Sequence, residues 1–211
     1  MDTIKRSNTK DEVAAIIKHE IISGNIPAGV CITQNDVADQ LGLSRMPIRE
    51  AFNVLVQDGF LKKLPTRKII VNKITPYTIE VYCQLLSSIE SDFLRLLIVN
   101  NTDAWHVLFS RFVENGKRLS QADELLQWHL MLSELCGDDL LSKIHLNIMN
   151  SFFLYALQNL SIDLQRQNEL IKQLYELTDD AKIDVNLIKP IVYHMNLAVL
   201  TPMIKRFSDE S

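Results

Sequence analysis

Cysteine is scarce in this chain of 211 residues, which contains only Cys31, Cys83 and Cys136, about fifty residues apart. Three widely spaced cysteines match neither a disulfide framework nor the ligand spacing of a zinc site. This usage is typical of a protein in a reducing compartment, so we expect a cytoplasmic location.

Long apolar runs are also absent. No segment has the ~18 uninterrupted apolar residues that a membrane span needs, and Arg95 interrupts the best candidate, residues 93–99. The first ten residues are polar and lack the apolar stretch of a secretion signal. We therefore expect neither a membrane protein nor a secreted one.

Glycine is rare as well, with six residues in all. The chain has no glycine-rich loop that could hold a phosphate and no strand–serine–helix nucleophile motif. No Cys/His pair has metal-ligand spacing, and no recognisable motif places a pair of carboxylates. These absences argue against an enzyme.

Charge is unevenly distributed, and the formal net charge of −4 hides this. Residues 1–73 contain eleven basic and eight acidic side chains, whereas residues 74–211 contain eleven and eighteen. Within residues 45–73 the ratio is seven basic to two acidic. A basic N-terminal segment on an acidic body indicates a nucleic-acid-binding element near the N-terminus.

Three short helices are predicted in this basic segment. Residues 10–23 have apolar side chains at helical spacing, namely Val13, Ile16, Ile17 and Ile21. Thr33 is a good N-cap for a second helix, which Gly42 ends. Ser44 begins a third, whose apolar stripe is Ile48, Ala51, Phe52 and Leu55.

Two short helices joined by a tight turn that contains glycine are typical of a helix-turn-helix. Arg45 and Arg49 lie four residues apart near the start of the second of these helices, opposite its apolar stripe. That end of a recognition helix contacts bases and phosphates in the major groove. A face of solvent-exposed arginines without a ligand is the alternative.

Two β-prone runs follow, residues 60–64 and 68–72, separated by Pro65, Thr66 and Arg67. They predict a hairpin with a basic tip, a wing that contacts the DNA backbone or minor groove. For Lys62, Lys63 and Lys68, a purely solubilising role is an equal alternative.

About fifty residues in register resemble the GntR family of bacterial transcription regulators. The matching segments are residues 22–29, residues 36–51 (Asp-Val-Ala-Asp-Gln-Leu-Gly-Leu-Ser-Arg-Met-Pro-Ile-Arg-Glu-Ala) and residues 55–61. The resemblance implies that Ser44, Arg45, Pro47 and Arg49 contact DNA. Two departures concern Asn35, where many members have an arginine, and the wing tip, where Arg67 and Lys68 replace a glycine-containing turn. The full predicted DNA-binding set is Thr33, Gln34, Asn35, Ser44, Arg45, Pro47, Arg49, Arg67 and Lys68.

From residue 75 onward the pattern is that of long helices with almost no strand signal. The first predicted helix spans residues 76–99, and residues 100–103 break it and cap a second that runs to residue 119. Further helices are predicted over residues 121–136, 139–160, 163–177 and 180–207, the last kinked or split by its prolines. Ser120 is expected to cap the third of these helices. The predicted fold class is mainly α: a winged helix-turn-helix over residues 1–74 and an all-α antiparallel bundle over residues 75–211.

The C-terminal body is similar to the FCD domain of the FadR branch of GntR regulators. The similarity rests on residues 128–132 and 137–141. Metal-binding members use an Asp four residues before the first His and three His ligands from separate helices. Here Leu125 stands at the Asp position and residues 167–171 contain no His, which leaves His129 and His194 as weak candidates. A divalent metal is therefore disfavoured, and His145 could contribute only if its helix turned it inward.

Other FCD-type members bind acidic or acyl effectors without a metal. The resemblance suggests an effector pocket whose candidate side chains are Arg95, Arg111, His129, Tyr155 and His194. Placement of these residues in the core or on the surface is the alternative.

The sequence thus predicts a homodimeric transcription regulator, with repression the favoured mode. It would bind double-stranded DNA at a palindromic operator, since each subunit reads one half-site. A small-molecule effector, such as a carboxylate or acyl compound, would set the operator affinity. The alternative is a regulator whose C-terminal domain serves only for dimerisation and binds no effector.

Overall fold

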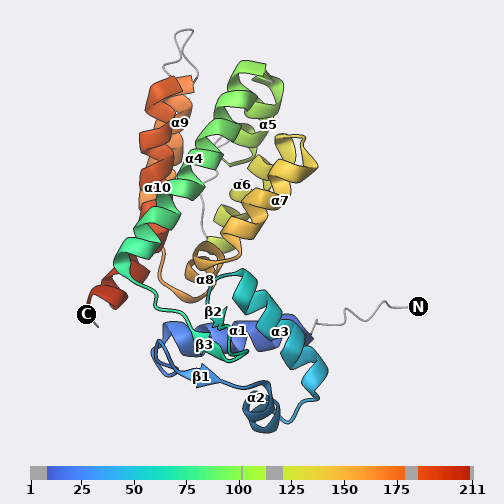
Figure 1. The fold of residues 1–211 in the computed structure, drawn as a ribbon. Coiled ribbons are helices and arrows are strands. Elements are labelled where there is room, and N and C mark those ends of the chain that lie inside the picture. The colour runs from blue at the N-terminus through green and yellow to red at the C-terminus, as the bar shows by residue number, and fades with distance from the viewer. Residues whose placement is uncertain (1–8, 101, 113–120, 179–184, 210–211) are drawn as a thin grey trace. The chain divides into compact units, whose positions relative to one another are not determined.

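The computed structural model describes residues 9–100, 102–112, 121–178 and 185–209 (Figure 1). The chain consists of two compact units that meet between Ile74 and Thr75 in the sequence. The described part of the first unit contains three helices and a small sheet, and that of the second is helical.

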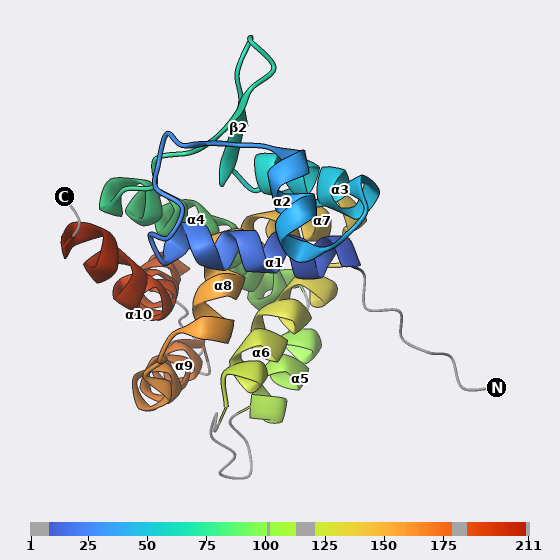
Figure 2. The ribbon, with the colours of Figure 1, turned by 90° about the horizontal axis from the view of Figure 1, so that it is seen from below.

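The N-terminal unit is a winged helix-turn-helix. Its elements are α1 (Thr9–Ile22), β1 (Cys31–Ile32), α2 (Gln34–Leu41), α3 (Arg45–Gln57), β2 (Leu61–Lys63) and β3 (Ile69–Val71). The strands form an antiparallel sheet in the order β1-β3-β2, with Leu61 opposite Val71 and Cys31 opposite Ile70. The loop between β2 and β3 projects beyond the three helices in Figure 2. Strand β1 was not predicted, because two residues are too few to show an alternating pattern.

The turn between α2 and α3 forms as the sequence predicts. The backbone N–H of Asp36 donates to the Thr33 hydroxyl at 3.1 Å, which caps the start of α2. At the other end, Gly42 has φ +64°, and the N–H of Leu43 donates to the carbonyl of Ala38 at 3.0 Å. Glycine suits this left-handed position because it has no Cβ. Ser44 is the N-cap of α3, although its hydroxyl makes no capping bond.

The core of this unit lies between α1 and α3. The buried face of α3 is the predicted stripe, Ile48, Ala51, Phe52 and Leu55. The prediction for α1 was wrong at one position, because Ile16 is 47% exposed. Its buried residues are Val13, Ala14, Ile17, Ile21 and Ile22. Ala14 is buried where Ile16 was expected, so the buried stripe is rotated from the one that residue size suggests.

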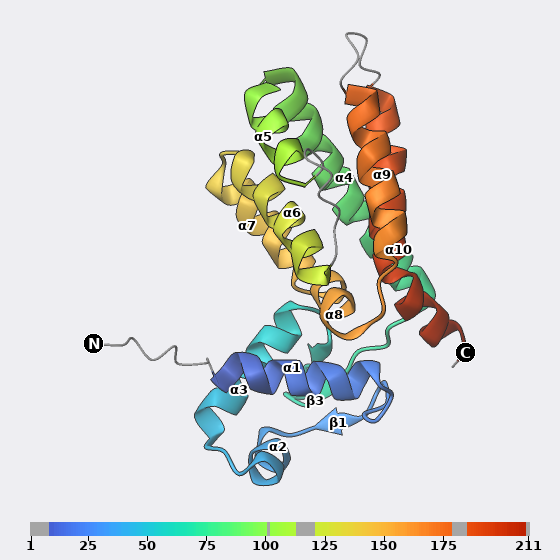
Figure 3. The same cartoon turned by 180° about the vertical axis from the view of Figure 1, so that it is seen from behind.

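The described helices of the second unit follow the predicted order. Their bounds are α4 (Pro76–Asn100), α5 (Thr102–Phe112), α6 (Ala122–Leu135), α7 (Asp139–Met149), α8 (Phe152–Asn159), α9 (Leu164–Thr178), the 3-10 turn η2 (Val185–Leu187) and α10 (Ile188–Asp209). Helix α10 lies beside α4 and α9 (Figures 1 and 3). It stays one helix although it contains Pro202.

Some predicted boundaries differ from the structure or cannot be compared with it. Gln121 is the N-cap of α6, and its backbone N–H donates to the Glu124 carboxylate at 3.3 Å. The predicted cap Ser120, the predicted helix end at residues 113–119 and the predicted helix start at residues 180–184 lie outside the described residues.

One predicted helix, residues 139–160, is two helices. The chain breaks at Ser151, where ψ is −104° and the helical path cannot continue. The Tyr82 hydroxyl, from α4, donates to the carbonyl of Ile148 and accepts from the N–H of Phe153 at 3.3 Å. Tyr82 therefore bonds the backbone on both sides of the break. Periodicity could not reveal this, because the partner lies 66 residues away in the sequence.

Among the described residues, no helix combines the length and apolar character that crossing a bilayer requires.

Two neighbouring isoleucines of α1 test this packing. Ile17 is 3% exposed and Ile16 is 47% exposed. We expect Ile17→Ala to lower the free energy of unfolding by about 2–5 kcal/mol through a lost core contact and a cavity. Ile16→Ala, the matched control, should change it by less than about 1 kcal/mol. Urea denaturation followed by circular dichroism measures both, and equal effects would contradict the assigned orientation of α1.

Candidate functional site

The outer face of α3 presents two arginines. Arg45 and Arg49 are both exposed, while Ile48 and Phe52 on the other face are buried. Ser44 is exposed and Pro47 is half-buried in the first turn of the helix. Burying one side of an amphipathic helix leaves the opposite side free, so the start of α3 offers cationic side chains to a partner.

A second group of predicted residues lies at the start of α2. Thr33 and Asn35 are exposed, and Gln34 is half-buried. The Thr33 hydroxyl is already engaged by the N–H of Asp36. Thr33 therefore has a structural role whether or not it also contacts DNA.

The wing tip is a tight loop of three residues, Pro65, Thr66 and Arg67. The N–H of Arg67 donates to the carbonyl of Leu64 at 2.9 Å, and the N–H of Leu64 donates to the carbonyl of Lys68 at 2.8 Å. This is a turn followed by a residue in the left-handed region, a common three-residue hairpin loop. The left-handed residue is Arg67, with φ +65°.

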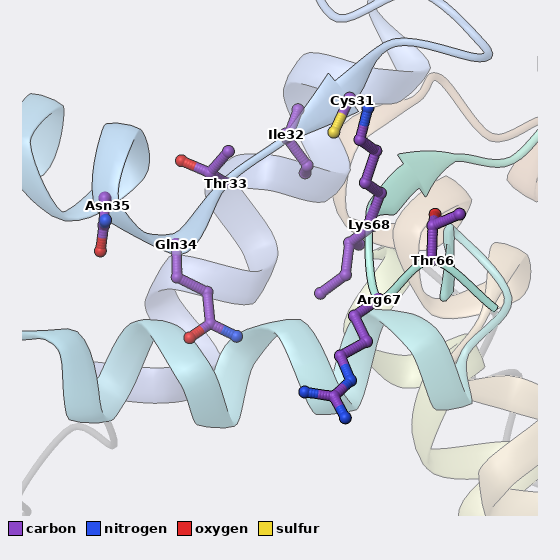
Figure 4. Close-up of a pocket in the computed structure, with 9 residues that line it drawn as sticks. Cys31, Ile32, Thr33, Gln34, Asn35, Thr66, Arg67 and Lys68 are labelled. Carbon is purple, nitrogen blue, oxygen red and sulfur yellow. The ribbon is translucent and has the colours of Figure 1, made fainter. Parts of the chain in front are cut away.

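A groove of about 330 Å³ lies between the wing and the start of α2 (Figure 4). Its lining includes residues 31–35 and residues 66–69. The groove therefore brings Thr33, Gln34 and Asn35 together with Arg67 and Lys68. Figure 4 shows the Lys68 side chain extending to the side of Cys31, while Arg67 extends the opposite way, to the side of Gln34. Arg45 and Arg49 are not among the residues that line it.

Lys18 on α1 holds the end of α3 in place. Its ammonium lies 3.0 Å from the carboxylate of Asp58, the C-cap of α3, with both side chains 13% exposed. The same ammonium lies 4.8 Å from the ring centroid of Phe60, where a cation–π attraction adds to the ion pair. These contacts were not predicted, because they join residues forty positions apart.

The second unit contains a buried carboxylate, Glu90 on α4. Its Oε1 lies 2.7 Å from His129 Nδ1 and 2.9 Å from His145 Nε2. Its Oε2 accepts a hydrogen bond from Asn196 Nδ2 at 2.6 Å, and that amide also donates to the Ser87 hydroxyl at 3.1 Å. We call Glu90, His129, His145 and Asn196 the Glu90 cluster. Its members come from α4, α6, α7 and α10, so it joins four helices.

The two imidazoles favour the ionised form of the Glu90 carboxylate. Burial by itself raises the pKa of Glu90, but the charges and hydrogen bonds of His129 and His145 outweigh burial and lower the pKa to about 2. Three buried atoms of the cluster, His129 Nε2, His145 Nδ1 and Asn196 Oδ1, have no hydrogen-bond partner in the described part of the chain. Buried polar atoms are seldom left so, and each is a point at which a ligand or water could bind.

The predicted pocket residues are dispersed. His129 belongs to the Glu90 cluster and Tyr155 is buried. Arg95 is exposed, with its guanidinium 3.4 Å from Asp92, and His194 is exposed. Arg111 lies in α5, and its side chain is outside the described part of the molecule. The structure therefore does not bring Arg95 and His194 together with His129.

Sequence reasoning missed Glu90 and Asn196. It named His145 only on the condition that its helix turned the side chain inward, and the structure meets this condition because His145 is buried. A signal for Glu90 was available, because Glu90 follows Leu86 and precedes Leu94 by four residues each, on the apolar stripe of α4. A carboxylate at such a position must be paired when it is buried. Its partners could not be identified, since they are 39, 55 and 106 residues away.

The metal site implied by the FCD resemblance does not fit these residues. His129 directs Nδ1 at Glu90, His194 is exposed, and Leu125 at the Asp position is buried. Among the described residues, no group of three or more His, Cys, Asp or Glu is arranged to hold a metal ion.

Comparison with known proteins agrees with the architecture of the first unit, a winged helix-turn-helix of bacterial regulators. Residues 9–71 match the family model described as bacterial regulatory proteins, gntR family. Residues 9–71 are thus similar to the helix-turn-helix domain of the GntR family. The branch to which the rest of the chain belongs stays a prediction.

Individual relatives match part of the chain. An uncharacterized HTH-type transcriptional regulator of Agrobacterium vitis is 28% identical over 42% of this chain and 52% of its own length. The gluconate operon transcriptional repressor of Bacillus licheniformis is 34% identical over 28% of this chain and 24% of its own length. The chain thus covers about half of the first relative and a quarter of the second. A solved GntR-family regulator from Pseudomonas syringae pv. tomato is 20% identical over 95% of this chain and 88% of that one, with a TM-score of 0.46.

The Glu90 cluster gives a pH-dependent prediction. We expect Glu90→Gln to lower the free energy of unfolding by roughly 3 kcal/mol at pH 7, because an amide N–H₂ must then face another donor. The pKa of Glu90 is lower in the folded state than its ordinary value of 4.5. Its stabilising contribution is therefore complete above pH 4.5 and is lost as the pH falls towards about 2.

Urea denaturation at pH 7, 5 and 3 measures the difference in the free energy of unfolding between the wild type and the Glu90→Gln variant. This difference should be similar at pH 7 and 5 and smaller at pH 3. Asp92→Asn is the matched control, because that side chain is 68% exposed and its pair with Arg95 contributes little. A Glu90→Gln variant as stable as the Asp92→Asn variant at pH 7 would refute the assigned role of the cluster.

Proposed function

We propose that this protein is a DNA-binding transcription regulator whose N-terminal domain inserts α3 into the major groove. The observation that carries the proposal is the pairing of a GntR-family domain with two exposed arginines, Arg45 and Arg49, at the start of its third helix. Ser44 and Pro47 in the same turn complete the proposed contact. The start of α2 and the wing add Thr33, Gln34, Asn35, Arg67 and Lys68.

The regulator acts as a homodimer on a palindromic operator in the cytoplasm. One α3 helix reads one half-site, so two subunits related by a two-fold axis read two. Exposed apolar side chains on α4 and α7 support pairing of the second unit, among them Leu85, Val99, Leu140 and Ile144.

Repression is the proposed mode, and a small molecule bound in the second unit changes the operator affinity. The relative from Bacillus licheniformis, which is named a repressor, supports the first part. The unpaired atoms of the Glu90 cluster support the second, since a ligand could satisfy them. Carboxylate and acyl compounds are the classes to test, and the negative charge of Glu90 favours those that also carry hydrogen-bond donors.

A second candidate is a regulator whose C-terminal unit only pairs the subunits. The observation in its favour is that Glu90 already bonds to His129, His145 and Asn196, so the carboxylate has no need of a ligand.

Removing the arginines of α3 tests DNA binding. We expect Arg45→Ala and Arg49→Ala each to weaken binding to a duplex enriched from a random DNA library by the full-length protein. A lost base contact reduces affinity about tenfold or more, and a lost phosphate contact lowers the salt dependence of log K by about one. Fluorescence anisotropy at several salt concentrations measures both quantities.

Arg166→Ala is the control, because this arginine is in the second unit with its side chain 46% exposed. It should leave the affinity unchanged. The proposal fails if the wild-type protein enriches no sequence, or if all three variants bind alike.

Thermal unfolding with a panel of carboxylates, acyl compounds and divalent metals separates the two candidates. An effector should stabilise the wild type, by about 2.7 kcal/mol at a hundred times Kd. The same effector should stabilise a His129→Ala variant less than the wild type. It should also change the affinity of the wild type for DNA. If no compound raises the melting temperature, the pairing-only candidate is favoured.

A further inference from the structure

Arg67 has a backbone conformation that its residue type disfavours. Among the described residues, six have positive φ: five are glycines, and the sixth is Arg67 with φ +65°. The left-handed region brings Cβ close to the following carbonyl oxygen, so residues other than glycine, asparagine and aspartate seldom occupy it.

The turn itself explains why this position is left-handed. The bonds from Arg67 N–H to the Leu64 carbonyl and from Leu64 N–H to the Lys68 carbonyl close a three-residue hairpin loop. In loops of this kind the last residue is left-handed and glycine is preferred. The fold therefore sets the backbone conformation but does not require an arginine.

Contacts within the domain do not account for the arginine either. Arg67 is exposed, and no hydrogen bond or ion pair involves its guanidinium in the described residues. Glycine would keep both turn hydrogen bonds and remove the steric conflict of Cβ. Backbone strain that the fold does not need is a reason to look for a function of the side chain.

We infer that Arg67 reads the minor groove next to the major groove that α3 enters, and that it selects A·T base pairs there. This inference rests on the proposed function. The minor groove of A·T-rich DNA is narrow and strongly negative, which attracts an inserted arginine. Guanidinium is less strongly hydrated than ammonium and enters such a groove more readily than lysine.

The neighbouring Lys68 has a different role. The Lys68 side chain extends towards Cys31, in the direction opposite to that of Arg67 (Figure 4). A phosphate contact by Lys68 strengthens binding to every sequence equally and carries no base preference. The two adjacent cations thus separate selectivity from general affinity.

The test uses the duplex enriched by the full-length protein, with the base pairs under the wing varied. One version replaces A·T with G·C, which adds the guanine N2 amine to the minor groove. Another uses inosine·cytosine, which resembles G·C in the major groove and A·T in the minor groove. The wild type should lose about fivefold or more in affinity on G·C and little on inosine·cytosine.

The Arg67→Gly and Arg67→Lys variants should lose this preference. For each variant, the affinities for the A·T, G·C and inosine·cytosine duplexes should agree within about twofold. Lys68→Gln, the matched control, should bind all of them more weakly and keep the wild-type preference. The Arg67→Gly protein should unfold at a temperature no lower than that of the wild type, because the left-handed position suits glycine.

The inference is overturned if Arg67→Gly keeps the A·T preference, if the wild type shows none, or if Arg67→Gly unfolds several degrees lower. These outcomes differ from failure of the proposed function, in which the wild type enriches no DNA sequence at all.

Discussion

Burial of one side of α3 is the constraint on which the rest of the N-terminal unit depends. Ile48, Ala51, Phe52 and Leu55 are each at most 1% exposed. Because an α-helix has 3.6 residues per turn, burial of this stripe turns Arg45 and Arg49 outward. The ion pair of Lys18 with Asp58 fixes the other end of the same helix. One packing requirement therefore both stabilises the domain and determines which side chains a partner meets.

The second unit contains a buried carboxylate that needs hydrogen-bond partners. Glu90 lies in a helical core where an unpaired carboxylate would be costly, and two imidazoles and an amide from three other helices compensate it. Any change at one member alters the hydrogen bonds of helices far apart in the sequence. The remaining polar atoms of the cluster, on two imidazoles and one amide, have no partner among the described residues.

Local patterns carried most of the fold prediction. The stripe of α3, the Thr33 cap and the Gly42 turn depend on neighbours within a few residues, and they were predicted correctly. The break at Ser151 and the partners of Glu90 depend on contacts across 39 to 106 residues, which no periodicity reveals. Ile16 shows a smaller failure, since size and spacing alone did not indicate which side of α1 would be buried.

Methylation interference tests the central claim most directly, because dimethyl sulfate modifies guanine N7 in the major groove and adenine N3 in the minor groove. The full-length protein should be blocked by guanine N7 methylation in two symmetric half-sites about one helical turn apart. Adenine N3 methylation should interfere in the adjacent minor groove. Binding that guanine N7 methylation leaves unchanged, or that depends on a single half-site, would contradict the account.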